Sequence, residues 1–258
     1  MSLSFCFIGA GNLATHLAQI IQQKVGPVIQ VYSRTRESAS DLATKLQTSF
    51  TISPESITRE ADIYFVALKD SALHEVLRKV DLKNKLLVHC SGSLPLSVLN
   101  CYSENTGVLY PLQTFSKNRR PDFSTIPVFI EANSENNGKI LVQIASAISS
   151  KVSVLDSGKR KSLHVAAVFA SNFVNHFYTL AADYLDSQHI SFEVLHPLIL
   201  ETALKAREMS PEKAQTGPAV RFDRNIIDAH LDKLDKFPEM KELYNSITTS
   251  IFERHQNK

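Results

Sequence analysis

The stretch of sequence that decides the fold is Leu3–Ala14, which reads LSFCFIGAGNLA. Its mostly apolar residues 5–9 predict a short buried strand, and the amphipathic run at 16–25 predicts the helix that follows. Between the two stands the pattern G-x-G-x-x-A. The first glycine permits a tight turn, the second lets a pyrophosphate approach the backbone, and the alanine lets helix and strand pack closely.

This pattern predicts a dinucleotide site, because it links a strand to a helix whose N-terminus offers free N–H groups and a positive dipole end. The alternative is a glycine turn that serves packing alone. The loop residues predicted to contact the cofactor are Gly9, Ala10, Gly11, Asn12, Leu13 and Ala14.

The composition is that of an ordinary globular protein, with 258 residues, 43% apolar residues and a formal charge of +2. The near-neutral charge and the lack of a basic cluster argue against a nucleic-acid partner. No apolar run reaches the ~18 residues of a membrane span, and Met1 leads straight into the first strand without room for a signal peptide. Three cysteines without a C-x-x-C pair predict buried free thiols in a reducing compartment. We therefore expect a cytoplasmic protein.

The end of the second predicted strand, 28–32, indicates which nucleotide binds. A site for NAD usually has an acidic residue here that holds the ribose 2′-hydroxyl. This chain has Ser33, Arg34, Thr35 and Arg36 instead. Because a guanidinium offers a fork of donors to phosphate oxygens, the sequence predicts NADP(H), with Arg34 as the main contact to the 2′-phosphate. Ser33 and Thr35 are expected to assist, and Arg36 is a further candidate. The alternative is a solvated charged loop.

Strands alternate with helices up to about residue 156, which predicts an α/β fold with a doubly wound, mostly parallel sheet of the Rossmann type. Further strands are expected at 51–52, 61–68, 85–90, 107–110, 127–131 and 152–155, and helices at 38–46, 53–56, 72–80 and 136–149. Ligands of such sheets lie beyond the carboxyl ends of the strands. Asp70, at one such end, is equally a candidate N-cap. The predicted cofactor contacts at these ends are Ala67, Leu68, Lys69, Ser71, Ser91 and Gly92.

The second part of the chain is predicted to be all helical. Neither Pro nor Gly occurs from 159 to 188, which predicts one long helix, and further helices are expected at 191–209, 223–234 and 238–255. We therefore expect a nucleotide-binding domain over 1–157 and a helical domain over 158–258.

The order of these parts resembles the superfamily of pyrroline-5-carboxylate reductase, 6-phosphogluconate dehydrogenase and deazaflavin-dependent NADP oxidoreductases. The segments YPLQTFS (110–116), HVAAVFASNF (164–173) and TGPAVRFD (216–223) look like an uncharacterised bacterial branch of it. That branch joins a Rossmann-like domain to a C-terminal helical domain of unknown function. The resemblance covers nearly the whole chain and implies an NADP(H) cofactor and a homodimer through the helical domain, which closes the cleft over the nicotinamide.

One departure from this superfamily concerns catalysis. Its hydroxyacid dehydrogenases carry a catalytic lysine on the long helix, four residues before an asparagine. The corresponding position before Asn172 is Val168, and Lys161 lies too far upstream to replace it. An alcohol dehydrogenase mechanism that uses this lysine is therefore not expected.

The remaining polar residues of the long helix supply the candidate catalytic groups. At ~100° per residue, His164, Ser171 and Asn175 share a narrow stripe with Asn172 on its flank. His164 is a candidate proton donor and Asn172 a candidate for orienting the substrate. The alternative, which the general pairing of buried polar groups favours, is that His164 is a structural histidine near the domain junction. No metal-ligand cluster is recognisable. The predicted substrate contacts are Tyr110, Gln113 and Thr114 near a strand end, and Arg221 beside a Gly-Pro turn.

The function expected from these residues is hydride transfer between NADP(H) and a small imine or carbonyl compound held between the domains. Two alternatives remain open: an NADP(H)-binding sensor or scaffold without turnover, and electron transfer to a deazaflavin-type cofactor.

Overall fold

The computed structural model of the chain describes residues 3–256. They form two compact units that divide between Asn172 and Phe173. This division by packing falls later along the chain than the domain boundary that we expect after residue 157. The domain boundary itself stays a prediction. Each unit is described by itself below.

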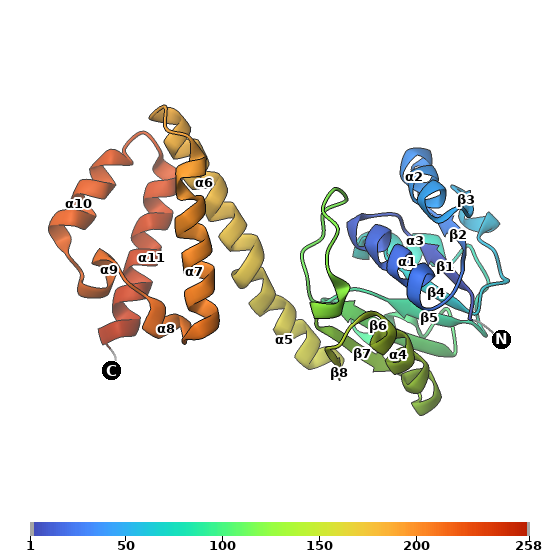
Figure 1. Cartoon of the computed structure of the whole chain (residues 1–258). Helices are drawn as coiled ribbons and strands as arrows, with labels where there is room; N and C mark the ends of the chain where they lie inside the picture. Colours follow the sequence, from blue (N-terminus) through green and yellow to red (C-terminus); the bar gives the residue numbers. More distant parts are fainter. Residues whose placement is uncertain (1–2, 257–258) are drawn as a thin grey trace. The chain divides into compact units, whose positions relative to one another are not determined.

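The first unit is built on one eight-stranded sheet (Figure 1). Its strands are β1 (Phe5–Ile8), β2 (Val28–Tyr32), β3 (Ser49–Thr51), β4 (Ile63–Val66), β5 (Leu86–His89), β6 (Asn105–Pro111), β7 (Val128–Ala132) and β8 (Val152–Val154). They lie in the order β3-β2-β1-β4-β5-β6-β7-β8, and all neighbours are parallel except β6 and β7. The prediction of a doubly wound, mostly parallel sheet is confirmed. Since the order reverses at β1, the ligand crevice is expected beyond the carboxyl ends of β1 and β4.

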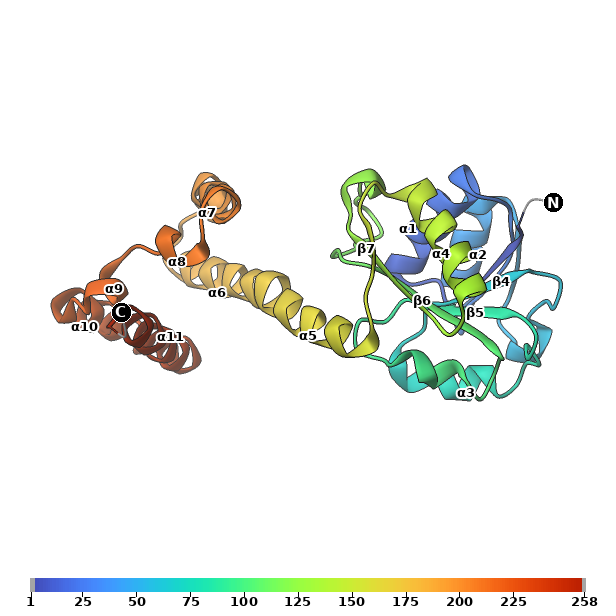
Figure 2. The same cartoon turned by 90° about the horizontal axis from the view of Figure 1, so that it is seen from below.

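Helices cover both faces of this sheet. The helices α1 (Asn12–Lys24), α2 (Arg36–Leu46) and α4 (Glu135–Ile148) bury their apolar sides on one face, whereas α3 (Leu73–Leu77) and the 3₁₀ turn Leu96–Leu99 pack on the other (Figure 2). Phe7 and Phe65 stack in the first of these cores, with ring centroids 5.0 Å apart. The central strands β1 and β4 are buried on both sides, as their continuous apolar sequence predicts.

Three local expectations differ from the structure. Asp70 is no N-cap, because it is the first residue of the 3₁₀ turn Asp70–Ala72, whose N-cap position is Lys69. Cys6 and Cys90 are buried free thiols as predicted, but Cys101 is exposed, since it lies in a turn after the 3₁₀ helix and not in a core element. The third strand lies at 49–51, two residues before its expected start.

The long helix contains a segment that its sequence did not reveal. It begins with α5 (Ser157–Ala167), continues as a π-helical segment, Val168–Phe173, and ends with α6 (Val174–Ser187). π segments are rare in proteins, and those that occur are often found at functional sites. This one carries Ser171 and Asn172, so the candidate substrate residues sit on an irregular part of the helix.

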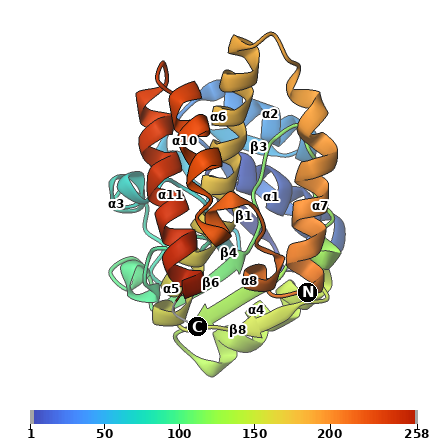
Figure 3. The ribbon, with the colours of Figure 1, turned by 90° about the vertical axis from the view of Figure 1, so that its left-hand side faces the viewer.

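The second unit contains α6 and five further helices (Figure 3). A 3₁₀ turn, Phe192–Leu195, capped by Ser191, leads into α7 (His196–Glu208). The remaining helices are α8 (Pro211–Ala214), α9 (Pro218–Arg221), α10 (Arg224–Lys233) and α11 (Pro238–Gln256). Within this unit α9, α10 and α11 pack together, while α7 stands apart from α10 and α11 (Figures 2 and 3). Over residues 3–256, no helix has the length and apolar character needed to cross a membrane.

Candidate functional site

The glycine loop between β1 and α1 is shaped by close packing against the next strand. Gly9 has φ +126°, and a Cβ atom there would lie 2.3 Å from the carbonyl oxygen of Ala67. Its N–H donates to the carbonyl of Tyr32 over 2.8 Å. Only glycine fits this position, because a side chain would meet both the strained φ and the backbone of the neighbouring strand. Gly9 therefore allows the tight turn that the sequence predicted.

Gly11 has the opposite surroundings. It is the N-cap residue of α1, and a Cβ atom there would meet nothing within 4 Å. No side chain caps this helix, and its first turn carries no acidic residue. The first N–H groups of α1 and the positive end of its dipole thus face open space, which suits a pyrophosphate.

A cavity of about 420 Å³ lies at this helix N-terminus. It brings together many predicted cofactor contacts from three strand ends, together with two candidates for the chemistry. Its lining includes Gly11, Asn12, Leu13, Ala14, Ala67, Leu68, Lys69, Asp70, Ser91, Gly92, Tyr110 and His164. The remaining predicted cofactor contacts, Gly9, Ala10, Ser33, Arg34, Thr35 and Ser71, are not part of this lining.

Arg34 lies just past β2, which is the neighbour of β1 in the sheet. It is exposed, and within the described residues it makes no ion pair. Arg36 differs, because its guanidinium lies over the ring of Phe50 at 5.7 Å. Of the two arginines, Arg34 is therefore the one whose head group is not held by a ring.

Hydroxyl groups connect two of the strand ends in the cavity. Ser93 donates its Oγ hydrogen to the carboxylate of Asp70 over 2.8 Å, and it also contacts Oγ of Ser91 at 2.9 Å. This chain fixes the carboxylate at the end of β4 to the loop that follows β5.

Tyr110 and His164 form a hydrogen-bonded pair at the edge of the same cavity. The Tyr110 hydroxyl lies 3.0 Å from Nδ1 of His164, and the rings meet edge to face with centroids 6.0 Å apart. Tyr110 is only 8% exposed, and burial raises the pKa of its phenol above the ordinary value, while the charge of Arg160 lowers it to a smaller extent. Gly92 forms a wall behind the histidine, since a Cβ atom there would lie 2.6 Å from Nδ1 of His164.

A second cavity, of about 550 Å³, adjoins the first across this pair. Tyr110 and His164 line both. The second cavity also contains the predicted substrate residues Gln113, Thr114 and Asn172, together with Ser171. The other residues that line it are apolar: Leu112, Leu163, Ala166, Ala167, Val168 and Ala170. Within residues 3–256, no carboxylate, lysine or arginine lines it.

The first turn of α5 is anchored by a buried arginine that sequence reasoning missed. Arg160 is fully buried, and its guanidinium pairs with the carboxylate of Glu131 and donates to the carbonyl of Leu94 over 2.6 Å. Ser157 donates to the same carboxylate over 2.8 Å. Arg160 lies four residues before His164, on the same side of the helix. The ion pair therefore fixes the turn of α5 that precedes the histidine.

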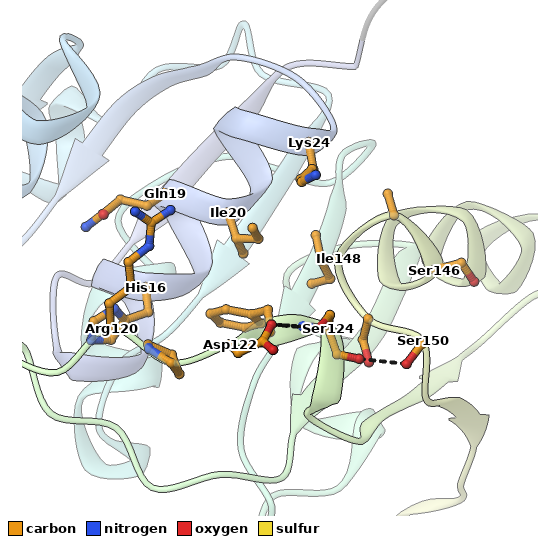
Figure 4. A pocket seen from close by; sticks show the side chains of 14 residues that line it. His16, Gln19, Ile20, Lys24, Arg120, Asp122, Ser124, Ser146, Ile148 and Ser150 are labelled. Atoms are coloured by element: carbon orange, nitrogen blue, oxygen red, sulfur yellow. Dashed lines mark hydrogen bonds between the residues drawn. The ribbon is translucent and has the colours of Figure 1, made fainter.

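Another cavity, of about 610 Å³, lies along α1 and the end of α4 (Figure 4). It is lined by His16, Lys24, Arg120 and several serines. The hydroxyl groups of Ser124 and Ser150 bond to Asp122 and to the carbonyl of Ser124, and that of Ser149 bonds to the carbonyl of Ile126. Because its own loop satisfies these groups and none of the candidate residues line it, we do not assign the chemistry to this cavity.

Arg221 lies in the second unit, as the last residue of α9, and is exposed. The preceding turn contains Gly217 with φ +103°, as expected for a Gly-Pro turn. Its role as a substrate contact stays a prediction.

The geometry can be compared with known proteins. Residues 4–92 match the family model "NADP oxidoreductase coenzyme F420-dependent", and residues 126–251 match a domain of unknown function, DUF2520. A crystal structure of a Bacteroides fragilis protein, described as a "putative NADP oxidoreductase", is 47% identical, with a TM-score of 0.95 and 98% of both chains covered. The chain belongs to this NADP oxidoreductase family.

More distant structures share the fold of these oxidoreductases. An imine reductase from Myxococcus stipitatus in complex with NADP⁺ is 14% identical, with a TM-score of 0.62, 98% of this chain covered and 93% of the other. Pyrroline carboxylate reductase from Plasmodium falciparum with NADP bound is 17% identical, with a TM-score of 0.58 and coverage of 99% and 98%. No curated protein matches the chain. The family confirms the resemblance inferred from the sequence motifs and the expected class of cofactor, NADP.

Proposed function

We propose that this chain is an NADP(H)-dependent reductase that transfers hydride between the nicotinamide and a small imine or carbonyl compound. One observation carries the proposal. The uncapped N-terminus of α1 and the Tyr110–His164 pair line a single cavity, and the same pair borders a second cavity of substrate size. The helix N-terminus that suits a nucleotide and the pair that can give a proton therefore line one cavity, and the pair also lines the cavity next to it.

The residues present fit an NADP(H) molecule. The helix N-terminus and the open space above Gly11 suit its pyrophosphate, and Arg34 would hold its 2′-phosphate with help from Ser33 and Thr35. Bound NADPH would supply the hydride. The Tyr110–His164 pair would supply the proton, and Asn172, Gln113 and Thr114 would orient the substrate in the second cavity.

A charge reversal at Arg34 tests the cofactor assignment. Arg34→Glu is expected to weaken NADPH binding relative to NADH by roughly 10- to 100-fold, because a charge-assisted hydrogen bond contributes ~1.5–3 kcal/mol. Titration of both nucleotides by fluorescence measures the ratio. Arg36→Glu is the matched control, since that guanidinium packs on Phe50. An unchanged preference in Arg34→Glu would refute the role of Arg34.

The second unit supports a homodimer. On α7, Leu198 and Leu200 are 62% and 61% exposed. A largely apolar groove of about 410 Å³ lies between α6, α9, α10 and α11 of the same unit. Exposed apolar side chains and an open apolar groove are typical of surfaces that another copy covers. Sedimentation of the wild type against Leu198→Glu/Leu200→Glu tests this: the wild type is expected as a dimer and the variant as a monomer.

A second candidate function is an NADP(H)-binding sensor without turnover. For either function we expect the protein in the cytoplasm. The observation that favours it is Val168, which stands where related hydroxyacid dehydrogenases have a lysine. Oxidation of NADPH with a panel of ketones, aldehydes and cyclic imines separates the two. Binding of NADPH without turnover of any compound would favour the sensor.

A further inference from the structure

The surroundings of the Tyr110–His164 pair narrow the proposed function to one substrate class and one proton donor. Both residues reach the boundary between the two cavities, so either side chain is placed to meet a substrate there. The choice between them follows from which atoms are already engaged. It also depends on what charge the second cavity can hold.

One ring nitrogen of His164 is already hydrogen-bonded within the protein. Its Nδ1 is hydrogen-bonded to the Tyr110 hydroxyl, and the backbone of Gly92 lies against the ring on the side of Nδ1, Cγ and Cβ. The imidazole is therefore held between a glycine and a phenol, with Nδ1 directed at the phenol oxygen. A ring held in this way is well placed to pass a proton to that oxygen and to stabilise a negative charge on it.

The phenol can itself give a proton to substrate. A phenol is neutral at physiological pH and is a much stronger acid than an alcohol, so transfer of its proton to a forming alkoxide is favourable. A ketone or aldehyde needs such a proton, because hydride addition to carbon leaves the charge on oxygen. An iminium ion needs none, because hydride addition gives a neutral amine directly.

Among the described residues, no carboxylate, lysine or arginine lines the second cavity to pair with an ionic substrate. Its polar members are Tyr110, Gln113, Thr114, His164, Ser171 and Asn172, and none of them is a carboxylate that would stabilise an iminium cation. Amide and hydroxyl groups beside apolar residues suit an uncharged compound with an apolar body and one polar end.

We propose that the substrate is an uncharged carbonyl compound, and that the Tyr110 hydroxyl is the group that protonates its oxygen while His164 supports it. This inference rests on the proposed function. A C–H bond forms as hydride reaches the carbonyl carbon, the C=O π bond breaks, and the oxygen takes the proton of Tyr110. The phenolate regains a proton through Nδ1 of His164, and the ring regains one from water. Bound NADPH would supply the hydride and so be the reductant, and the carbonyl would be reduced to the alcohol.

Steady-state kinetics of Tyr110→Phe test the donor. With uncharged ketones and aldehydes, kcat is expected to fall by ~100-fold or more, as for the loss of a general acid, with NADPH affinity unchanged within about twofold. Any reduction of an N-methylated cyclic iminium salt is expected to be equal in both enzymes, because that substrate requires no proton. Tyr102→Phe is the matched control, since it removes a similar bond to Nδ1 of His74 at 2.7 Å, away from both cavities.

Two variants address the histidine without removing the phenol. His164→Gln is expected to lower kcat less than Tyr110→Phe does, because the phenol that protonates the substrate remains in place. Gly92→Ala is expected to displace the ring, because its Cβ would lie 2.6 Å from Nδ1. A readout independent of turnover is the ¹⁵N NMR spectrum of the His164 ring, in which the Nδ1 signal should shift in Tyr110→Phe and Gly92→Ala but not in Tyr102→Phe.

The outcomes separate this inference from the proposed function. If none of the carbonyl compounds or imines tested causes the wild type to oxidise NADPH, the proposed function fails and this inference fails with it. If the wild type reduces carbonyl compounds but Tyr110→Phe costs less than tenfold, or loses ketone and iminium reduction equally, only this inference is overturned. A wild type that reduces imines and no carbonyl compound also overturns it.

A carboxylated substrate is the remaining rival. If keto acids are reduced better than their uncharged esters and Arg221→Ala removes the difference, the uncharged class is wrong and the anion contact predicted for Arg221 is right.

Discussion

The glycine loop at Gly9–Ala14 and the Tyr110–His164 pair border the same cavity, yet they are built in opposite ways. The loop is made of consecutive residues and presents backbone N–H groups at the start of α1. The pair joins side chains 54 residues apart, one on β6 and one on α5. The loop depends on the absence of side chains at Gly9 and Gly11. The pair depends on tertiary packing that holds α5 in place.

The largest expected effect is on the loop side of this comparison. Gly9→Ala should destabilise the protein by about 3–6 kcal/mol, because it combines a strained positive φ with overpacking against Ala67. Gly11→Ala should leave the melting temperature unchanged, since its Cβ meets no protein atom within 4 Å, but it should weaken NADPH binding. Thermal melts and nucleotide titrations of both variants measure the contrast. Equal stability of the two variants would contradict the different roles assigned to the two glycines.

The next effect concerns the anchor of the pair. Arg160→Met leaves the Glu131 carboxylate without its buried partner and should cost about 3–5 kcal/mol, as for other broken buried ion pairs. The double variant Arg160→Met/Glu131→Gln should recover much of that loss, since no unpaired charge remains. Urea denaturation measures both. If the double variant is no more stable than Arg160→Met, the unpaired charge is not the cause of the loss.

A smaller effect on the free energy of unfolding is expected from pH, through His89. Burial, helped by the charge of Arg160, lowers the pKa of His89 from 6.5 to about 4. The unfolded chain therefore binds a proton that the folded chain does not between these values, so stability should fall as the pH is lowered from about 6.5 to 4. At ~1.4 kcal/mol per pKa unit, the loss is at most about 3 kcal/mol.

His89→Asn should remove most of this slope in denaturation curves measured across that window. His176→Asn, at an exposed position of α6, is the control. A slope that persists in His89→Asn would assign it to other groups.

The same contrast explains how much the sequence could predict. Gly9, Gly11 and Ala14 encode a local backbone shape, and β2 was predicted at its observed bounds, because period and turn residues act over a few positions. The contact between Tyr110 and His164 and the burial of Arg160 depend on segments far apart in the chain, which no local pattern records. Arg160 illustrates this best, since a lone arginine in an amphipathic helix normally indicates the solvent side.

The π segment Val168–Phe173 was invisible for a related reason. Its residues are ordinary helix residues, and the wider turn differs from an α-helix only in which carbonyl each N–H reaches. The stripe expected from regular α-helical spacing grouped His164 with Ser171 and Asn175, whereas the second cavity is lined by His164, Ser171 and Asn172.

This wider turn also means that the helix holds one residue more than a regular helix would over the same path. Shortening it by a single residue, for example by deleting Ala170, would restore uniform winding and change which side the residues of the segment face. Ser171 would then stand six residues after His164 and leave the side of the helix that His164 occupies. The number of residues in this segment thus determines which of its polar side chains line the second cavity.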